Sequence, residues 1–431
     1  MSELALFGGK PILNQTFPAY YTVNTEEKTA VDSIFANKEL LSDFLGRAGS
    51  KFLGGRHVKV LEKAFTEYFG TKHAVSFNSA TTGLQAAVTA LGIGPGDQVI
   101  VPPYTMSATA SAVLLNNAVP VFADVDETFC LDPESVEKNI NAQTKAIFVV
   151  DLMGGTPKFD RILEIAKKYN LKIIEDCAQA MGASYKGKLA GTIGDIGVFS
   201  FNIHKVVQCG EGGVLITNND NYALRAQLVR NHGEAVVNDM IVEGGEFEAI
   251  VGSNYRMSEL HAVVALEQFK KLDVLNCERI TLADHFTERL KEIDWLVPSP
   301  ALENSKHVYY IYPFKIISEK IGITRKTFVE AMRAENFAIA EGYQKPLYLL
   351  PVYQQKKMFP NSQFPFVSTE YPQNISYEKG ICPVVEKMYF EEVMHTSMCQ
   401  RPQSKSDIDL FVDAVKKIER NIEELKEYER K

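Results

Sequence analysis

The chain has 431 residues, of which 45% are hydrophobic and 23% are charged, and its formal net charge is −8 at pH 7. This length predicts two domains rather than one. The negative charge and the lack of a strong basic patch argue against a nucleic-acid partner, because phosphates are bound mainly by Lys and Arg. We therefore expect a small-molecule substrate.

The six cysteines are scattered, with no C-x-x-C pair and no metal-ligand spacing, so we expect reduced thiols and no metal site. They are Cys130, Cys177, Cys209, Cys277, Cys382 and Cys399. The N-terminal residues lack the basic segment and long apolar run of a signal peptide. No stretch of about 18 apolar residues occurs, so we expect a cytoplasmic protein that does not enter a membrane.

From residue 25 to residue 275, helical periodicity alternates with short apolar runs. The expected helices are Thr25–Ala36, Val58–Tyr68, Ser79–Leu91 and Asp160–Tyr169. The expected strands are Ala74–Phe77, Gln98–Val101, Val119–Ala123, Ala146–Val150, Lys172–Glu175, Ile196–Ser200 and Gly213–Thr217. This alternation predicts an α/β fold with a mostly parallel sheet that is covered on both faces.

The pattern changes after Leu275, and the later elements predict a smaller α+β domain. They are a helix at Asn276–Ile293, an extended run at His307–Ile316, a helix at Thr324–Glu335 and a final amphipathic helix. We therefore divide the chain into a large domain, residues 1–275, and a small C-terminal domain, residues 276–431. The irregular segment Tyr348–Tyr377 is rich in Pro, Gln and aromatic residues, and we expect it to shape the substrate pocket.

Two patterns in the C-terminal half are expected to be structural. Ser406 and Asp409 resemble a capping box at the start of the last helix. Four aromatic residues recur in a strand-like run, where packing in the core is the favoured interpretation. They are His307, Tyr309, Tyr310 and Tyr312.

Two acidic residues, Glu175 and Asp176, end a predicted buried strand. Ligands of open α/β sheets bind at the carboxyl ends of strands, where a carboxylate can be a metal ligand, a general base or the partner of a cationic ring nitrogen. The sequence places no set of His and Cys ligands nearby, which disfavours a metal. A protonated pyridine nitrogen, as in pyridoxal 5′-phosphate (PLP), is a suitable partner.

One lysine, Lys205, follows the predicted strand Ile196–Ser200 and precedes the glycine-rich turn Gly210–Gly213. A lysine in a low-dielectric site favours the neutral amine, which Schiff-base chemistry requires. The alternative is an ordinary lysine in a surface loop. The strand before it and the turn after it favour the functional interpretation.

The segment Asn78–Leu84 joins a strand to a helix. Its small and hydroxylated residues, Ser79, Ala80 and Thr81, leave backbone N–H groups free at a helix N-terminus, which favours a phosphate. Ser200 is able to add a hydroxyl. Simple N-capping by Ser79 or Thr81 is the alternative.

These segments together resemble the DegT/DnrJ/StrS family of PLP-dependent aminotransferases, which have the aspartate-aminotransferase-like fold (fold type I). The matching stretches are NSATTGLQAA (78–87), ALGIGPGDQVIVPPYT (90–105), PVFADVD (120–126), IIEDCAQAMGA (173–183), GDIGVFSF (194–201), GEGG (210–213) and GSNYRMSEL (252–260). Their order and spacing make the resemblance strong over nearly the whole chain.

The resemblance implies a role for each candidate residue. Lys205 forms the internal aldimine, Asp176 pairs with the pyridine nitrogen, and Gln179 bonds the ring 3-hydroxyl. The amides of Ala80 and Thr81, with the hydroxyl of Ser200, hold the phosphate. Met106 stands where many members carry an aromatic residue that stacks on the ring. Asn254 reaches the phosphate of a neighbouring subunit, which implies a homodimer with shared active sites.

The implied activity is a ping-pong transfer of an amino group from glutamate or glutamine to a keto group of a nucleotide-linked sugar, with PLP and its aminated form (PMP) alternating. A cyclitol ketone is a second candidate acceptor. Two further interpretations are dehydration of a keto sugar and a PLP-binding regulatory protein that has lost catalysis. Relatives that act as dehydratases replace the lysine by histidine; here His204 is only a neighbour, which favours transamination.

Overall fold

The computed structural model describes residues 2–242, 250–372 and 374–431. Its main sheet has seven strands in the order β1-β9-β8-β5-β4-β2-β3. Their bounds are β1 (His73–Phe77), β2 (Gln98–Val101), β3 (Val119–Phe122), β4 (Thr144–Val150), β5 (Lys172–Asp176), β8 (Ile196–Ser200) and β9 (Gly213–Thr217). Only β9 runs antiparallel to its neighbours in this sheet. The predicted α/β fold with a mostly parallel sheet is confirmed.

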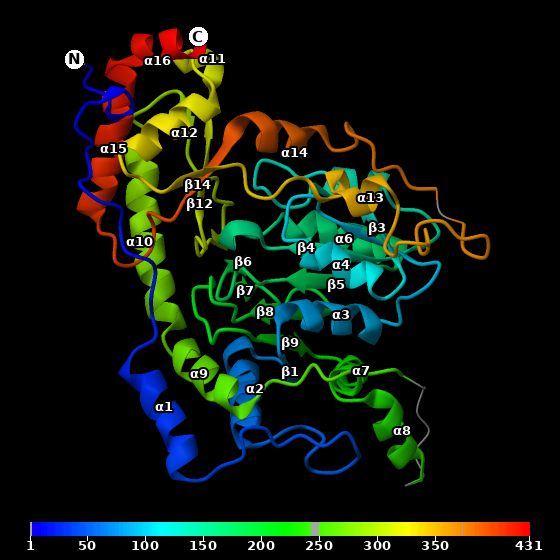
Figure 1. Ribbon diagram of the computed structural model, residues 1–431. Helices are drawn as coiled ribbons and strands as arrows, with labels where there is room; N and C mark the ends of the chain where they lie inside the picture. Colours follow the sequence, from blue (N-terminus) through cyan, green and yellow to red (C-terminus); the bar gives the residue numbers. More distant parts are fainter. Residues whose placement is uncertain (1, 243–249, 373) are drawn as a thin grey trace.

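Helices cover both faces of this sheet (Figure 1). One face packs against α3 (Ala80–Ala90), α4 (Ala108–Leu114) and α7 (Asp220–Arg230), and the other against α2 (Arg56–Phe69), α5 (Pro133–Lys138), α6 (Phe159–Tyr169) and α9 (Glu259–Phe269). Strand β2 shows why both faces are apolar. Val99 packs in the same cluster as Leu84 of α3, whereas Ile100 packs in the same cluster as Ile162 of α6. Successive side chains of a strand point to opposite faces, so a doubly covered strand is apolar throughout.

A second, antiparallel sheet has the order β10-β12-β14-β13. Its strands are β10 (Leu296–Val297), β12 (Tyr312–Ile316), β13 (Ile339–Glu341) and β14 (Val393–Thr396). It shares a core with α10 (Leu272–Leu290), α12 (Arg325–Ala334) and α15 (Lys405–Arg420). A small sheet of β6 (Ser184–Tyr185), β7 (Lys188–Leu189) and β11 (Ser305–Lys306) joins the two halves of the chain.

Several elements cross the predicted boundary at residue 275, so the division into two domains stays a prediction. Helix α10 runs continuously through it (Figure 1). Leu4 and Leu13 pack in the core beside the four-stranded sheet, whereas Leu347 and Val385 pack in the core of the seven-stranded sheet. The remaining helices are α1 (Thr25–Ala36), α8 (Gly233–Val242), α11 (Ser318–Ile321), α13 (Pro351–Gln354), α14 (Pro383–Lys387) and α16 (Ile422–Glu429), with a π-helix at Met388–Glu392 and short 3-10 turns at Ala5–Phe7, Leu152–Gly154 and Leu347–Leu349. No helix in the described ranges has the length and apolar character needed to cross a membrane.

The segment Tyr348–Tyr377 packs on the edge strand β3; Gln373 within it lies outside the described residues. The rings of Tyr353 and Tyr377 lie 5.2 and 5.7 Å from the ring of Phe122 in β3. The hydroxyl of Tyr377 donates to the carbonyl of Pro120 at 2.8 Å. Tyr353 and Tyr377, in the segment that we expected to shape the substrate pocket, therefore pack in the core beside β3.

The last helix was predicted with the wrong start. The capping box is formed by Ser404 and Asp407, and Ser406 lies inside α15, where its hydroxyl contacts that of Ser404 at 2.8 Å. Asp409 instead pairs with Arg289. The predicted single helix is also two, since α15 ends at Arg420 and α16 begins at Ile422.

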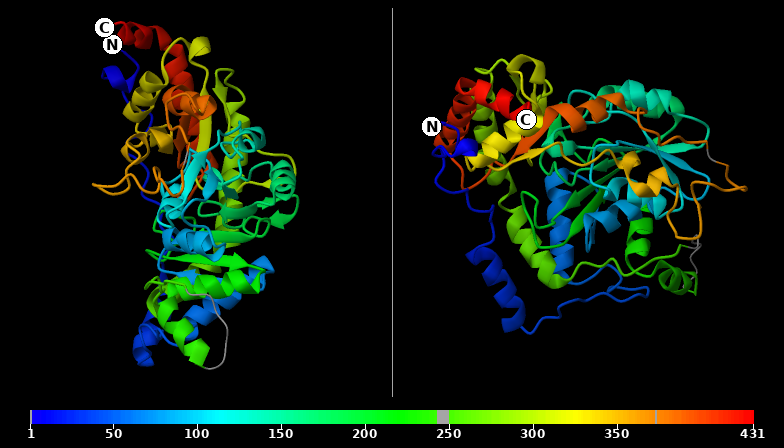
Figure 2. Two further views of the ribbon diagram at one scale, coloured as in Figure 1. Left: turned by 90° about the vertical axis from the view of Figure 1, so that its right-hand side faces the viewer. Right: turned by 45° about the horizontal axis from the view of Figure 1, so that its top comes forward.

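The two chain ends lie together, and a buried ion pair holds them (Figures 1 and 2). Glu335 is 1% exposed and accepts hydrogen bonds from the backbone of Ala5 and Ile12, at 3.0 and 2.8 Å. Its carboxylate also binds the Lys417 ammonium at 2.9 Å, and Lys417 donates to the carbonyl of Lys10 at 2.8 Å. The N-terminal segment is thus attached to α12 and α15 by one carboxylate.

We predict that Glu335→Ala lowers the free energy of unfolding by about 3–5 kcal/mol, because it leaves the buried Lys417 ammonium without a counter-charge. Urea unfolding followed by circular dichroism measures the change. Glu330→Ala is the matched control on α12, because Glu330 is only partly buried and pairs with Lys326, which is 73% exposed, and pairs in contact with solvent contribute little. Equal losses in both variants would contradict the role given to Glu335.

Candidate active site

Five parallel strands of the main sheet end at one cavity of about 420 Å³. The segments after β1, β2, β5 and β8 and the last residue of β4 all contribute, as expected for ligand sites at the carboxyl ends of parallel strands. The lining residues are Ser79, Ala80, Thr81, Leu84, Thr105, Met106, Ala108, Val150, Asp176, Ala178, Gln179, Ser200, Asn202, His204, Lys205, Glu211, Tyr310, Tyr343 and Gln344. Every site residue predicted from the sequence is in this set except Asn254.

Asp176 is the last residue of β5 and is 4% exposed. One carboxylate oxygen accepts from the hydroxyl of Thr109 at 2.8 Å, and the other from the backbone N–H of Ala178 at 3.2 Å. Burial raises the pKa of Asp176, while Thr109, Ala178 and the charge of Lys205 lower it. The carboxylate is therefore held in one orientation at the wall of the cavity.

Its neighbour Glu175 has a different task. Its oxygens accept backbone N–H groups of Gly191, Ile193 and Gly194, at 2.8, 2.8 and 2.5 Å. Burial raises the pKa of Glu175 to about 7, and these three bonds oppose the shift. Because its acceptor sites are occupied by the turn before β8, we interpret Glu175 as structural.

Glu175 also belongs to a buried cluster that no motif in the sequence indicates. The ligand atoms of Asp151, Glu175 and Cys177 lie within 4.8 Å of one another. The thiol of Cys177, however, donates to Asp151 at 3.1 Å. Burial, followed by the charge of Glu175, raises the pKa of Asp151 well above its usual range. A carboxyl with a raised pKa and a thiol that donates to it make a hydrogen-bonded cluster rather than an anionic ligand set.

Lys205 lies in the loop after β8 and lines the same cavity as Asp176, and its amine lies 4.8 Å from the ring centre of Tyr310. Burial lowers the pKa of Lys205 to about 8, although the charge of Asp176 raises it. About a tenth of the amine is therefore neutral at pH 7, and about half at pH 8. This is the state that attacks a carbonyl.

We predict that the rate at which the protein without cofactor captures PLP rises about tenfold per pH unit below pH 8 and levels above it. The reason is that only the neutral Lys205 amine reacts. Stopped-flow absorbance measures the rate. In Asp176→Asn the midpoint should move to lower pH, because the charge that favours the ammonium is gone. A midpoint near 10.5 in both proteins would contradict this account.

The N-terminus of α3 forms another wall of the cavity. Ser79 is the N-cap, and its hydroxyl accepts from the N–H of Thr82 at 3.2 Å. The helix start rests directly on β9, because a Cβ at Gly213 would lie 2.5 Å from the nitrogen of Ala80. Ser79 thus does cap the helix, while Ala80 and Thr81 in its first turn line the cavity, at the helix end where the dipole favours an anion.

Gln179 connects this cavity to the second sheet. Its amide oxygen accepts from the N–H of Met153 at 2.8 Å, and its amide nitrogen donates to the hydroxyl of Tyr343 at 2.7 Å. Tyr343 follows β13, 164 residues later in the chain. Side chains from both sheets therefore build one site.

Met106 and Asn254 differ from the buried residues. Met106 is 52% exposed at the rim of the cavity. Asn254 is exposed, lies outside the lining set and accepts from Arg256 at 2.7 Å. The site of a single chain thus leaves Asn254 free to face another molecule.

Tyr310 was missed, because its alternating aromatic neighbours predicted core packing. The expected strand begins only at Tyr312, and Tyr309 has a left-handed backbone with φ of 47°. Arg279 of α10 donates to the carbonyls of Tyr309 and Tyr310, at 3.2 and 3.1 Å. These two hydrogen bonds hold the backbone out of the strand, so the ring of Tyr310 lies beside the amine of Lys205. No local pattern in the sequence reveals a partner 31 residues away.

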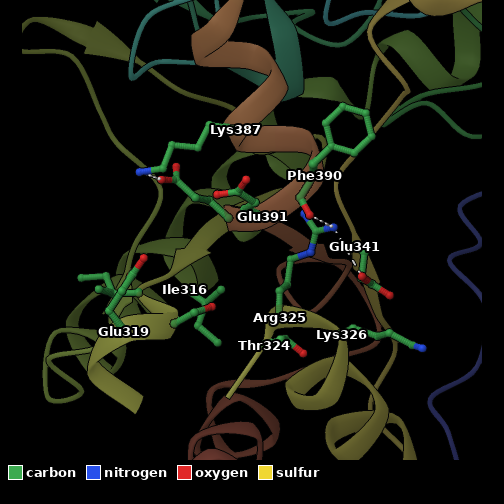
Figure 3. A pocket seen from close by; sticks show the side chains of 12 residues that line it. Ile316, Glu319, Thr324, Arg325, Lys326, Glu341, Lys387, Phe390 and Glu391 are labelled. Atoms are coloured by element: carbon green, nitrogen blue, oxygen red, sulfur yellow. Dashed lines mark hydrogen bonds and ion pairs between the residues drawn. The ribbon is translucent and has the colours of Figure 1, made fainter. Parts of the chain in front are cut away.

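A second cavity, also about 420 Å³, lies beside the four-stranded sheet between α12 and the π-helix (Figure 3). Two ion pairs lie within its lining, Arg325 with Glu341 and Lys387 with Glu392. It contains none of the residues predicted from the sequence. We therefore place the chemistry at the cavity that holds Lys205.

Comparisons with known proteins show the family to which the chain is similar. A model of the DegT/DnrJ/EryC1/StrS aminotransferase family matches residues 39–395. The L-glutamine:scyllo-inosose aminotransferase of Streptomyces griseus is 34% identical over 352 residues, covering 80% of this chain and 81% of that protein. The GDP-perosamine synthase of Caulobacter vibrioides is 36% identical over 301 residues, covering 69% and 79%. An aminotransferase structure from Psychrobacter cryohalolentis superposes with a TM-score of 0.79 at 26% identity, covering 94% of this chain and all of that one.

Proposed function

Because the chain belongs to the DegT/DnrJ/EryC1/StrS aminotransferase family, we propose that it transfers an amino group from glutamate or glutamine to a keto group of a nucleotide-linked sugar. The family is PLP-dependent, and its members act on sugar substrates with amino donors. The observation that carries the proposal is the pair formed by Lys205, with its pKa lowered to about 8, and the buried Asp176 in one cavity.

The residues of the cavity fit PLP. Asp176 offers a fixed, buried carboxylate to a ring nitrogen, and Gln179 offers an amide to the ring hydroxyl. The helix start at Ser79, Ala80 and Thr81, with Ser200, would hold the phosphate. Met106 would pack on the ring through its thioether. When bound, PLP supplies an electron sink for the bonds at the amino-bearing carbon.

Lys205 would perform the proton transfers. At pH 8 about half of its amine is neutral and half is protonated, so it is able both to take a proton from one carbon and to return it to another. Tyr310 covers the amine at 4.8 Å and limits the space in which it moves. Because this one amine would serve both half-reactions in turn, we propose a ping-pong scheme.

The lining of the cavity favours a polyhydroxylated acceptor. Thr105, Asn202, Tyr343 and Gln344 bring hydroxyl and amide groups to it. Such groups bind sugar hydroxyls through single hydrogen bonds. No arginine, the residue that suits carboxylates best, is among the described residues that line the cavity.

The test is to load the purified protein with PLP, add glutamine or glutamate, and follow the visible absorption band. Bleaching by the donor and recovery on addition of a TDP- or GDP-linked keto hexose would support the proposal. Release of water without any amino donor would instead indicate a dehydratase. A band that no donor changes would favour a regulatory protein.

A cyclitol ketone is the second candidate acceptor. The relative from Streptomyces griseus, named for its action on scyllo-inosose, aligns over 352 residues, a longer stretch than the 301 residues of the perosamine synthase. Recovery of the band with scyllo-inosose, and not with the nucleotide-linked hexoses, would favour it.

We further propose a homodimer in which Asn254 of the partner subunit reaches the phosphate site. Leu40, Leu45 and Val251 are 58%, 47% and 81% exposed, and the loop with Leu45 is bonded to Asn231, which pairs with Asn254. Exposed apolar side chains gathered in this way suit an interface. Sedimentation at the mass of one chain would contradict the dimer.

A further inference from the structure

The orientation of the Gln179 amide is fixed by two bonds on opposite sides. Its oxygen accepts from the N–H of Met153 at 2.8 Å, so the nitrogen must lie on the other side, where it donates to Tyr343 at 2.7 Å. The reverse orientation would set the amide nitrogen against the N–H of Met153. An amide nitrogen carries two hydrogens. Tyr343 takes one of them, and the second remains for the cavity that Gln179 lines.

Tyr343 is presented by a rigid turn of the four-stranded sheet. Gly342 has φ of 59°, and a Cβ there would lie 2.8 Å from the ring of Tyr389. Its N–H donates to the carbonyl of Val393 at 2.7 Å, and its carbonyl binds Nδ1 of His395 at 2.6 Å. The backbone next to Tyr343 is therefore fastened to β14 and to the π-helix.

Arg325 fixes these elements in turn. Its guanidinium is almost buried and donates to the carbonyls of Tyr389 and Val393, at 2.7 and 3.1 Å. Figure 3 shows the same group reaching the carbonyl of Phe390 and the carboxylate of Glu341 at the end of β13, at 3.1 and 3.3 Å. One cation thus sets the strand before Tyr343 against the π-helix.

The ring of Tyr343 then crosses to the main sheet. It meets the ring of Tyr104 edge-on, with 6.0 Å between centres, and the ring of His395 at 6.1 Å. Burial raises the pKa of Tyr343 above its ordinary value. The phenol therefore stays neutral, and its oxygen remains an acceptor for Gln179.

We propose that Tyr343 is a positioning residue for the cofactor: it holds the amide of Gln179 so that the second N–H meets the ring hydroxyl oxygen of bound PLP. The four-stranded sheet thereby controls a hydrogen bond of the cofactor. The inference rests on the proposed function for the identity of the cofactor. A hydrogen bond donated to that oxygen lowers the affinity of the oxygen for the proton that it shares with the nitrogen of Lys205.

The deciding experiment is a pH titration of the visible band in PLP-loaded protein. In Tyr343→Phe the midpoint should rise by about 0.3 to 1 pH unit. Without the Tyr343 hydroxyl, the Gln179 amide is held less firmly, so the hydrogen bond that it donates to the ring oxygen is weaker. Gln179→Ala should raise the midpoint at least as far. In the double variant, Tyr343→Phe should add nothing, because it acts only through Gln179.

Tyr348→Phe is the matched control. It removes a tyrosine hydroxyl from the same part of the chain, one that donates to Glu386 and lies outside the cavity, and its midpoint should equal that of the wild type. An unshifted midpoint in Tyr343→Phe, an additive double variant or an equal shift in Tyr348→Phe would overturn the inference. If the wild type binds PLP but aminates no keto sugar or cyclitol, the proposed function fails while this titration still decides the role of Tyr343.

Discussion

Replacement of Lys205 by alanine is expected to lower the rate of transamination by about 10³-fold or more. Among the described residues that line the cavity, Lys205 is the only one with a primary amine. The variant therefore loses both the group that attaches the cofactor and the group that moves the proton. His204 also lines the cavity, but it is exposed and belongs to the outer part of the loop.

The measurement is the single-turnover bleaching of the visible band by glutamine in PLP-loaded Lys205→Ala. Lys172→Ala serves as the control, because Lys172 lies at the opposite end of β5 and pairs with Asp195. Partial recovery of Lys205→Ala by added methylamine would show that the missing amine, and not misfolding, causes the loss. Near wild-type turnover in Lys205→Ala would refute the assignment.

The main sheet and most of the candidate site were predictable because both depend on local sequence. A strand buried on both faces is a short apolar run, and the polar residues directly after it must lie at its carboxyl end. Asp176 after β5 and Ser200 at the end of β8 were found in this way. The prediction that these residues lie at one edge of the sheet did not require knowledge of the strand order.

The residues that the sequence did not reveal depend on contacts between distant segments. Thr109 is a small residue inside an apolar helix, and only the structure shows that it binds Asp176, 67 positions later. Tyr310 reaches the cavity because Arg279 binds backbone carbonyls far along the chain. This arginine does not stand out by spacing or motif. The displaced capping box has another cause, since several polar residues precede α15 and the one that becomes the N-cap, with an extended backbone, is Ser404.

Asp176→Asn should lower the rate of each half-reaction by about 10²- to 10³-fold while the protein stays folded and binds PLP. Asparagine has the same shape and keeps an oxygen for Thr109 or Ala178, so the geometry at the end of β5 is retained. What disappears is the negative charge that keeps a ring nitrogen protonated. Because burial of that charge is costly, the variant should be no less stable than the wild type.

For Glu175→Gln, one residue earlier, we expect the opposite: stability falls, and the rate changes little. An amide nitrogen there would face either the backbone N–H of Gly191 or those of Ile193 and Gly194, so stability should fall. The remaining folded enzyme should keep most of its rate, since Glu175 is outside the cavity. Urea unfolding and single-turnover bleaching on both variants separate the two effects. If Glu175→Gln slowed the half-reactions and Asp176→Asn did not, the carboxylate of Asp176 would not be the partner of the cofactor.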